Sequence, residues 1–229
     1  MNTTEIIALL KAEAEPDFIL KMQHFGVDTS NALGVRVPNI RKIAKQIGKN
    51  HPLAIELWKT NIHEARFVAS MIADYRLFTE ALFDTWVVDF NSWDMCDQAC
   101  FNVLDKVPFA MNKIPVYATD EREFVKRTAF TLIAGMAIHN KKEDDAFFLP
   151  FLPIIEQQAY DERNFVKKAV NWALRQIGKR SEVLRLRALE TAYRIEQQPS
   201  KAAKWIAKDA IRELTDEKII NNVNRKKSK

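Results

Sequence analysis

Residues 120–127 read Asp-Glu-Arg-Glu-Phe-Val-Lys-Arg, and residues 161–168 repeat this stretch as Asp-Glu-Arg-Asn-Phe-Val-Lys-Lys, 41 positions later. Each copy runs into an apolar pattern with helical spacing, over residues 129–137 and 169–177. Weaker echoes lie at residues 64–73 and 204–212. A period of roughly 40–47 residues is typical of HEAT and armadillo arrays, so the repeat predicts an all-α superhelix.

Each repeat is expected to be a pair of antiparallel helices that cannot bury its apolar face alone. Stacking about five such pairs gives a continuous core, with the second helices lining a concave face. We expect one HEAT-like domain over residues 1–220 and a basic, mobile tail over residues 221–229. Asp120 is predicted to cap a helix N-terminus with Glu123 in a capping box. Gly178 is predicted to end a helix in the left-handed conformation.

The composition agrees with a helical, weakly basic protein. Hydrophobic residues make up 47% of the 229 positions, and there are only 5 glycines, fewer than a β-rich chain needs for its turns. Residues 1–119 carry 12 Lys and Arg against 14 Asp and Glu, whereas residues 120–229 carry 23 against 16. The positive charge therefore lies in the second half, and it favours a polyanionic partner only weakly.

Two cysteines, Cys96 and Cys100, lie four residues apart in a helical stretch. We expect them to be buried, reduced thiols, because no histidine or third cysteine lies near them to complete a zinc site. The four histidines have no ligand-like spacing, and no glycine-rich phosphate loop is present, so we expect no metal and no nucleotide cofactor. The longest apolar run, residues 130–138, is too short to cross a bilayer, which favours a cytoplasmic protein.

The most unusual cluster is Asn91-Ser-Trp-Asp-Met-Cys-Asp-Gln-Ala-Cys100. Trp93 and Asp97 are four residues apart and share one helical face, whereas Asp94 is rotated away and suits a helix start. A core tryptophan beside a surface aspartate is the simpler interpretation of this pair.

The second copy of the repeat carries a possible basic face. Lys168 occupies the position of Arg127 in the first copy, and Trp172 and Arg175 follow it. A solvent-facing stripe of these three residues would combine cations that hold phosphates with a ring that contacts a sugar or base. Core packing of Trp172 is the alternative.

The chain resembles the AlkD-type family of DNA alkylation-repair glycosylases. The resemblance runs from about residue 34 to about residue 214. It rests on Gly34-Val-Arg-Val-Pro-Asn-Ile-Arg-Lys, on Ser92-Trp-Asp-Met-Cys-Asp97, on Lys126-Arg-Thr-Ala129 and on Lys168-Ala-Val-Asn-Trp-Ala-Leu-Arg175. The family's active-surface residues map onto Trp93, Asp97, Arg127 and Trp172. The best-known member has a tyrosine at the position of Phe25 and a second tryptophan at the position of Ser92.

The resemblance implies a monomeric enzyme that excises N3- and N7-alkylated purines from duplex DNA, which its concave face would bind. Asp97 would stabilise the oxocarbenium-like sugar and orient water, while Trp93 and Trp172 press on the lesion's sugar. Lys126, Arg127, Lys168 and Arg175, with Phe25 beside them, would contact the DNA.

Two alternatives stay open at this stage. One is a HEAT protein that binds damaged or branched DNA without catalysis, as paralogues in the family do. The other is a solenoid that binds proteins along its groove. Retention of the Trp93/Asp97 pair argues against the first alternative, because phosphate binding needs no carboxylate.

Overall fold

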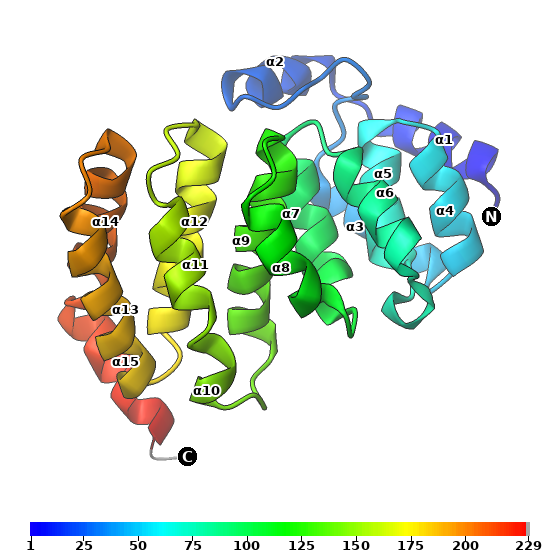
Figure 1. Cartoon of the computed structure of the whole chain (residues 1–229). Coiled ribbons are helices and arrows are strands. Elements are labelled where there is room, and N and C mark those ends of the chain that lie inside the picture. The colour runs from blue at the N-terminus through cyan, green and yellow to red at the C-terminus, as the bar shows by residue number, and fades with distance from the viewer. Residues whose placement is uncertain (228–229) are drawn as a thin grey trace. The chain divides into compact units, whose positions relative to one another are not determined.

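The computed structural model describes residues 1–227, which contain α-helices and short 3-10 turns and no β-strand (Figure 1). The predicted all-α fold is therefore confirmed. The backbone groups into two compact units, Met1–Phe109 and Ala110–Lys229. The assignment of residues 1–220 to one domain stays a prediction.

The first unit contains seven α-helices and two 3-10 turns. They are α1 (Thr3–Ala12), α2 (Pro16–His24), α3 (Val37–Ile47), α4 (His51–Lys59), α5 (His63–Ile72), η1 (Tyr75–Leu77), α6 (Glu80–Val88), α7 (Trp93–Asn102) and η2 (Leu104–Lys106).

The helices of the first unit form two layers. In one layer α5 packs between α3 and α7, and α4 packs on α5 from the other layer. Trp58 of α4 stacks on Trp86 of α6 with ring centroids 3.9 Å apart, and both rings are fully buried. The pairs α4–α5 and α6–α7 thus correspond to two of the predicted repeats. Helix α2 buries only Met22, so it is a surface helix.

The second unit contains α8 (Ala110–Ala118), α9 (Glu123–His139), α10 (Asp145–Phe148), α11 (Phe151–Gln158), α12 (Asn164–Gly178), α13 (Glu182–Glu196), α14 (Lys201–Leu214) and α15 (Glu217–Lys227).

Three helix pairs stack in this unit, namely α8–α9, α11–α12 and α13–α14 (Figure 1). The second helices form one layer, in which α12 packs between α9 and α14. The first helices form the other layer, in which α11 contacts both α8 and α13. Every residue from Val125 to Ala137 of α9 is buried, so this helix is the centre of the core.

The turns within the pairs differ from the predicted capping box. The α9 helix begins at Glu123 with Arg122 as its N-cap, and Asp120 instead accepts hydrogen bonds from the Arg122 backbone N (2.8 Å) and Nε (2.9 Å). Asp161 and Arg163 make the same turn before α12. The capping-box prediction was wrong, because this aspartate bonds two residues ahead and the arginine between it and the helix takes the cap position.

The prediction for Gly178 was also wrong. The residue is the last of α12, and the described glycines with positive φ are Gly26, Gly34 and Gly48. A Cβ on Gly178 would lie 2.7 Å from the Leu214 side chain, so a glycine here permits α12 and α14 to approach closely. Its role is packing rather than backbone conformation.

The C-terminal helix extends further than the sequence predicts. A mobile tail is predicted from residue 221, yet α15 continues to Lys227 and buries Val223. The helix packs against α13 and α14. Residues 228–229 of the predicted tail lie outside the described residues. No helix of the described part is both long and apolar enough to cross a membrane.

Candidate functional site

Trp93 is the first residue of α7, and Asp97 lies one turn later on the same helical face. Both side chains are partly exposed to solvent. The Trp93 Nε1–H donates a hydrogen bond of 2.9 Å to the backbone carbonyl oxygen of Phe25, which restrains the indole on the surface of the unit. Trp93 is therefore not a core tryptophan, unlike the buried Trp58 and Trp86.

Phe25 directly follows α2, and 56% of its surface is exposed. Because its carbonyl accepts from Trp93, the residue lies next to the indole, which supports its place in the candidate site. From the sequence, Phe25 is assigned to the site only by ungapped alignment back from Gly34, because no repeat fixes the alignment of this stretch.

A buried carboxylate holds the loop that leads from Phe25 to α3. Glu64 of α5 is fully buried and accepts hydrogen bonds from the backbone N–H groups of Leu33 (2.8 Å), Gly34 (2.8 Å) and Val35 (3.1 Å). Gly34 has a φ of +81°, and a Cβ there would meet the Glu15 carbonyl oxygen at 2.6 Å. The glycine of the Gly34-Val-Arg motif is thus required by backbone geometry.

Asp94 has a structural role, as its position on the helix indicates. Its carboxylate accepts from Ser92 Oγ (2.6 Å) and the Met95 backbone N (2.9 Å), and lies 3.0 Å from His63 Nε2. Burial alone raises the pKa of Asp94, but the hydrogen bond with His63 and its charge outweigh burial and leave the pKa below the usual value. Ser92, which departs from the family's best-known member, is buried as part of this network.

A second group of candidate residues lies on α12. Lys168 is exposed and Trp172 is partly exposed, whereas neighbours facing the core are buried: Ala169, Val170, Ala173, Leu174 and Ile177. The Trp172 ring therefore lies beside the apolar stripe of α12 and not within it. Lys168 and Trp172, one turn apart, present a cation and an aromatic ring on one face.

Arg175 is already engaged by acids of α14. Its Nη1 forms ion pairs with Glu213 and, at 3.4 Å, with Asp209. These ion pairs direct the Arg175 guanidinium towards α14. We propose that Arg175 mainly joins α12 to α14.

Lys126 and Arg127 are both almost completely buried. The Nζ of Lys126 donates to Gln158 Oε1 (3.1 Å) and forms an ion pair with Asp161 Oδ2 (3.2 Å). Arg127 Nη1 donates to the Phe165 carbonyl oxygen at 2.6 Å. Both contacts tie α9 to the next repeat. We therefore leave Lys126 out of the proposed DNA contacts, and phosphate binding by Arg127 requires its other N–H donors.

Sequence reasoning missed a polar cluster in the first unit. Asn91 Nδ2 donates to Asp28 Oδ2 at 2.7 Å, and a small cavity beside this bond is lined by Asp28, Asn31, Asn61, His63, Arg66, Asn91 and Met95. The cluster joins the loop after α2 to the loop before α7. Its members come from separate loops and from α5 and α7 with no common spacing, so no sequence pattern predicts it.

The two cysteines are buried and form no disulfide within residues 1–227, as predicted. Burial, together with the neighbouring Cys96, raises the pKa of the Cys100 thiol well above its usual value, so this thiol is a poor nucleophile. Among residues 1–227, no group of three or more potential ligands is arranged to hold a metal ion.

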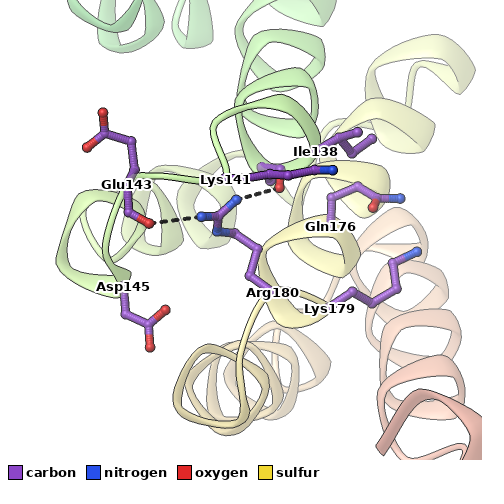
Figure 2. A pocket seen from close by; sticks show the side chains of 8 residues that line it. Ile138, Lys141, Glu143, Asp145, Gln176, Lys179 and Arg180 are labelled. Atoms are coloured by element: carbon purple, nitrogen blue, oxygen red, sulfur yellow. Dashed lines mark hydrogen bonds between the residues drawn. The ribbon is translucent and has the colours of Figure 1, made fainter. Parts of the chain in front are cut away.

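A pocket of about 800 Å³ lies at the C-terminal ends of α9 and α12 (Figure 2). Its lining mixes charges of both signs, including Lys141, Glu143 and Lys179. Arg180 donates to the carbonyl oxygens of Ala137 (2.7 Å), Asn140 (2.9 Å) and Glu143 (3.0 Å), which holds the turn after α9. Its hydrogen bonding is thus directed at the backbone. The candidate residues Lys168 and Trp172 are not part of the lining.

The candidate residues thus form two local groups. Phe25, Trp93 and Asp97 belong to the first unit, and Lys168 and Trp172 belong to the second. In each group a partly exposed indole lies next to a charged side chain on the same helix.

The fold has a counterpart among solved structures. One structure, described as "A new family of proteins related to the HEAT-like repeat DNA glycosylases with affinity for branched DNA structures", matches with a TM-score of 0.76 and 19% sequence identity. The match covers 93% of this chain and 95% of the other. At this identity the likeness establishes the HEAT-like repeat fold. No curated protein matches the sequence significantly.

The sequence also matches a family model. The model described as "DNA alkylation repair enzyme" aligns with residues 6–214, which include both local groups of candidate residues. This match spans most of the chain and agrees with the helix pairs of the two units. The chain belongs to the DNA alkylation repair enzyme family.

Proposed function

We propose that this protein is a DNA glycosylase that removes cationic N3- and N7-alkylated purines from duplex DNA. The observation that carries the proposal is the Trp93–Asp97 pair, in which a restrained, partly exposed indole lies one turn from a partly exposed carboxylate. A carboxylate repels phosphates, so it weakens a surface that only binds DNA. It becomes useful where positive charge develops on the bound molecule.

The proposed reaction needs no strong general acid. A purine alkylated at N3 or N7 is already cationic, so the glycosidic electron pair leaves with the base as a neutral purine. Positive charge then grows on the deoxyribose in an oxocarbenium-like state. In the proposal, the Asp97 carboxylate stabilises this charge, orients the water that adds to the anomeric carbon, and accepts a proton from it.

The other residues have supporting roles in the proposal. Trp93 places a ring face against the sugar, where the π-electrons favour a cation, and Trp172 offers a ring face to the DNA from the second unit. Lys168, exposed at the start of α12, binds a backbone phosphate. These residues would recognise the lesion through its sugar and phosphates, so the enzyme would not require a deep pocket for a flipped base.

Binding of branched DNA without catalysis is the second candidate function. One observation favours it: the matching solved structure is described as having affinity for branched DNA. This candidate predicts tight binding to branched DNA and no base release. It gives Asp97 no role.

The two candidates separate in one experiment. The purified protein is incubated in excess with a duplex containing N7-methylguanine, and free base is measured over time, while binding to intact and three-way branched DNA is measured in parallel. The glycosylase proposal predicts base release well above the spontaneous rate. Release at the spontaneous rate together with preferential binding of branched DNA would favour the second candidate.

A further inference from the structure

Helix α14 carries an exposed basic face that none of the proposed catalytic contacts uses. Lys201, Lys204, Lys208 and Arg212 are exposed, and so is 41% of Trp205. At 3.6 residues per turn, all five lie within an arc of about 100°. The opposite side of α14 is buried against α12 and α13, so this arc is the outward surface of the last helix in its layer.

The acids near this face are already engaged. Glu213 pairs with Arg175 and Lys179, and Asp209 pairs with Arg175 and Arg212. Glu162, from the turn before α12, accepts a hydrogen bond from the Ala202 backbone N at 3.1 Å. Within residues 1–227, no ion pair joins Lys201, Lys204 or Lys208 to a carboxylate, so their charges face solvent.

Helix stability does not explain this arrangement. Lys201 and Lys204 lie in the first turns of α14, where the helix dipole is positive and disfavours cations. Lys204, Lys208 and Arg212 follow one another at intervals of four residues, a spacing at which like charges repel. An anionic partner on this face would offset both costs.

The exposed indole of Trp205 indicates which kind of anionic partner would bind this face. Lys167 of α12 places its Nζ 5.1 Å from the centroid of the Trp205 ring, so α12 and α14 present one continuous surface. Lys168, the proposed phosphate contact, is the next residue on α12. Cations flanking a partly exposed aromatic ring are the combination that binds a nucleic-acid backbone and stacks an unpaired base.

We propose that the α14 face, made of Lys167, Lys201, Lys204, Trp205 and Lys208, also binds DNA, with the lysines binding phosphates and Trp205 stacking on an unpaired base. The proposal rests on the DNA-binding part of the proposed function but not on catalysis. It extends the contact surface from α12 to the last repeat. It also predicts a preference for DNA with unpaired bases and assigns that preference to Trp205.

Salt dependence of binding tests the lysines. Dissociation constants of the full chain for a fluorescent duplex are measured by anisotropy over a range of salt concentrations. In Lys204→Glu/Lys208→Glu the slope of log affinity against log salt should become shallower by about 2, one for each lost phosphate contact. Lys141→Glu/Lys142→Glu changes the charge equally in the exposed turn after α9, at the other end of the helix layer, and should leave the slope unchanged.

Substitution of Trp205 tests the stacking. Trp205→Ala should weaken binding to a gapped DNA with unpaired thymines by about fivefold or more, and leave binding to the intact duplex nearly unchanged. Lys204→Gln/Lys208→Gln repeats the salt measurement without introducing new acids. Circular dichroism melting of every variant verifies the fold.

The proposal would be overturned if the salt slopes of the lysine variants equalled the wild-type slope. It would also be overturned if Trp205→Ala lost the same affinity for gapped DNA as for intact duplex. Base release from methylated duplex is measured on the same proteins. Normal release with unchanged salt slopes refutes the α14 face alone, whereas altered slopes in a protein that releases no base refute only the glycosylase proposal.

Discussion

At the scale of single residues, the candidate site depends on a few buried charges that hold surface loops. Glu64 is the clearest case, because one carboxylate satisfies three successive backbone N–H groups of the loop that follows Phe25. Phe25 in turn restrains Trp93 through its carbonyl oxygen. The indole is thus placed by a chain of contacts that begins in the core.

Glu64→Gln should lower the free energy of unfolding by about 1.5–3 kcal/mol, because an amide NH₂ would face one of the three donors and the charge-assisted bonds would be lost. Urea unfolding followed by circular dichroism measures the change. Glu56→Gln is a suitable control, since Glu56 is exposed and accepts a hydrogen bond from Thr3 Oγ1. Its effect should stay within about 0.5 kcal/mol. Equal effects of the two substitutions would contradict the proposed role of Glu64.

The sequence was informative for residues on regular helices and uninformative for residues on loops. Helical spacing placed Trp93 and Asp97 on one face and rotated Asp94 away, and the structure has both features. Spacing says nothing of how loops meet, so Asp28 and Asn91 were missed. A family motif also does not distinguish a buried cation from an exposed one, so the resemblance implies a DNA contact for Lys126 although its side chain is buried.

At the scale of helices, ion pairs between successive repeats tie the layers together. Lys126 of α9 and Asp161, in the turn before α12, are both buried and pair at 3.2 Å. Asp161 also pairs with Arg163, as the corresponding aspartate of the preceding turn, Asp120, pairs with the exposed Arg122. The aspartate of this repeated turn is thus buried in one copy, at Asp161, and only partly buried in the other, at Asp120.

Asp161→Asn should destabilise the fold by about 3 kcal/mol, because it removes the charge of the carboxylate that pairs directly with the buried Lys126. Asp120→Asn should cost no more than about 1 kcal/mol, because its partner is exposed. Chemical denaturation of the two variants side by side measures the difference. A larger loss for Asp120→Asn would contradict this assignment.

The effect of Asp161→Asn should also depend on pH. Burial raises the pKa of Asp161, but hydrogen bonds from Arg163 and Lys126 outweigh burial and leave it below the ordinary value of 3.8. Because the pKa of Asp161 is lower in the folded state than in the unfolded state, its ionised form stabilises the fold at pH values above 3.8. This stabilisation is lost as the pH falls through the folded-state pKa. The difference between wild type and variant should therefore shrink as the pH falls below 3.8.

The repeat itself was predictable, because its 41-residue period is written in the sequence. Its turns were less so. Aspartate is a residue type favoured at the N-cap, but Asp120 accepts hydrogen bonds from the backbone N–H and the guanidinium of Arg122. The helix therefore begins after Arg122 and not after Asp120. Gly178 follows an apolar stripe as a helix-ending glycine does, but its reason is the Leu214 side chain, which lies far away in the sequence.

At the scale of the whole molecule, membership of the DNA alkylation repair enzyme family and the positive charge of the second half favour a DNA partner. The charge is not spread evenly over the second unit. Lys126 and Arg175 are compensated within the fold, whereas Lys168 and the lysines of α14 face solvent. Net charge alone did not reveal this division, because it counts paired and unpaired cations alike.

Replacement of one carboxylate tests the central claim most directly. Single-turnover release of N7-methylguanine from duplex DNA is compared for wild type and Asp97→Asn, with the dissociation constant for the same DNA measured in parallel. The account predicts that Asp97→Asn reduces release by at least about 100-fold, as loss of a group that stabilises transition-state charge does, while affinity for the DNA is kept. Release by Asp97→Asn at the wild-type rate would contradict it.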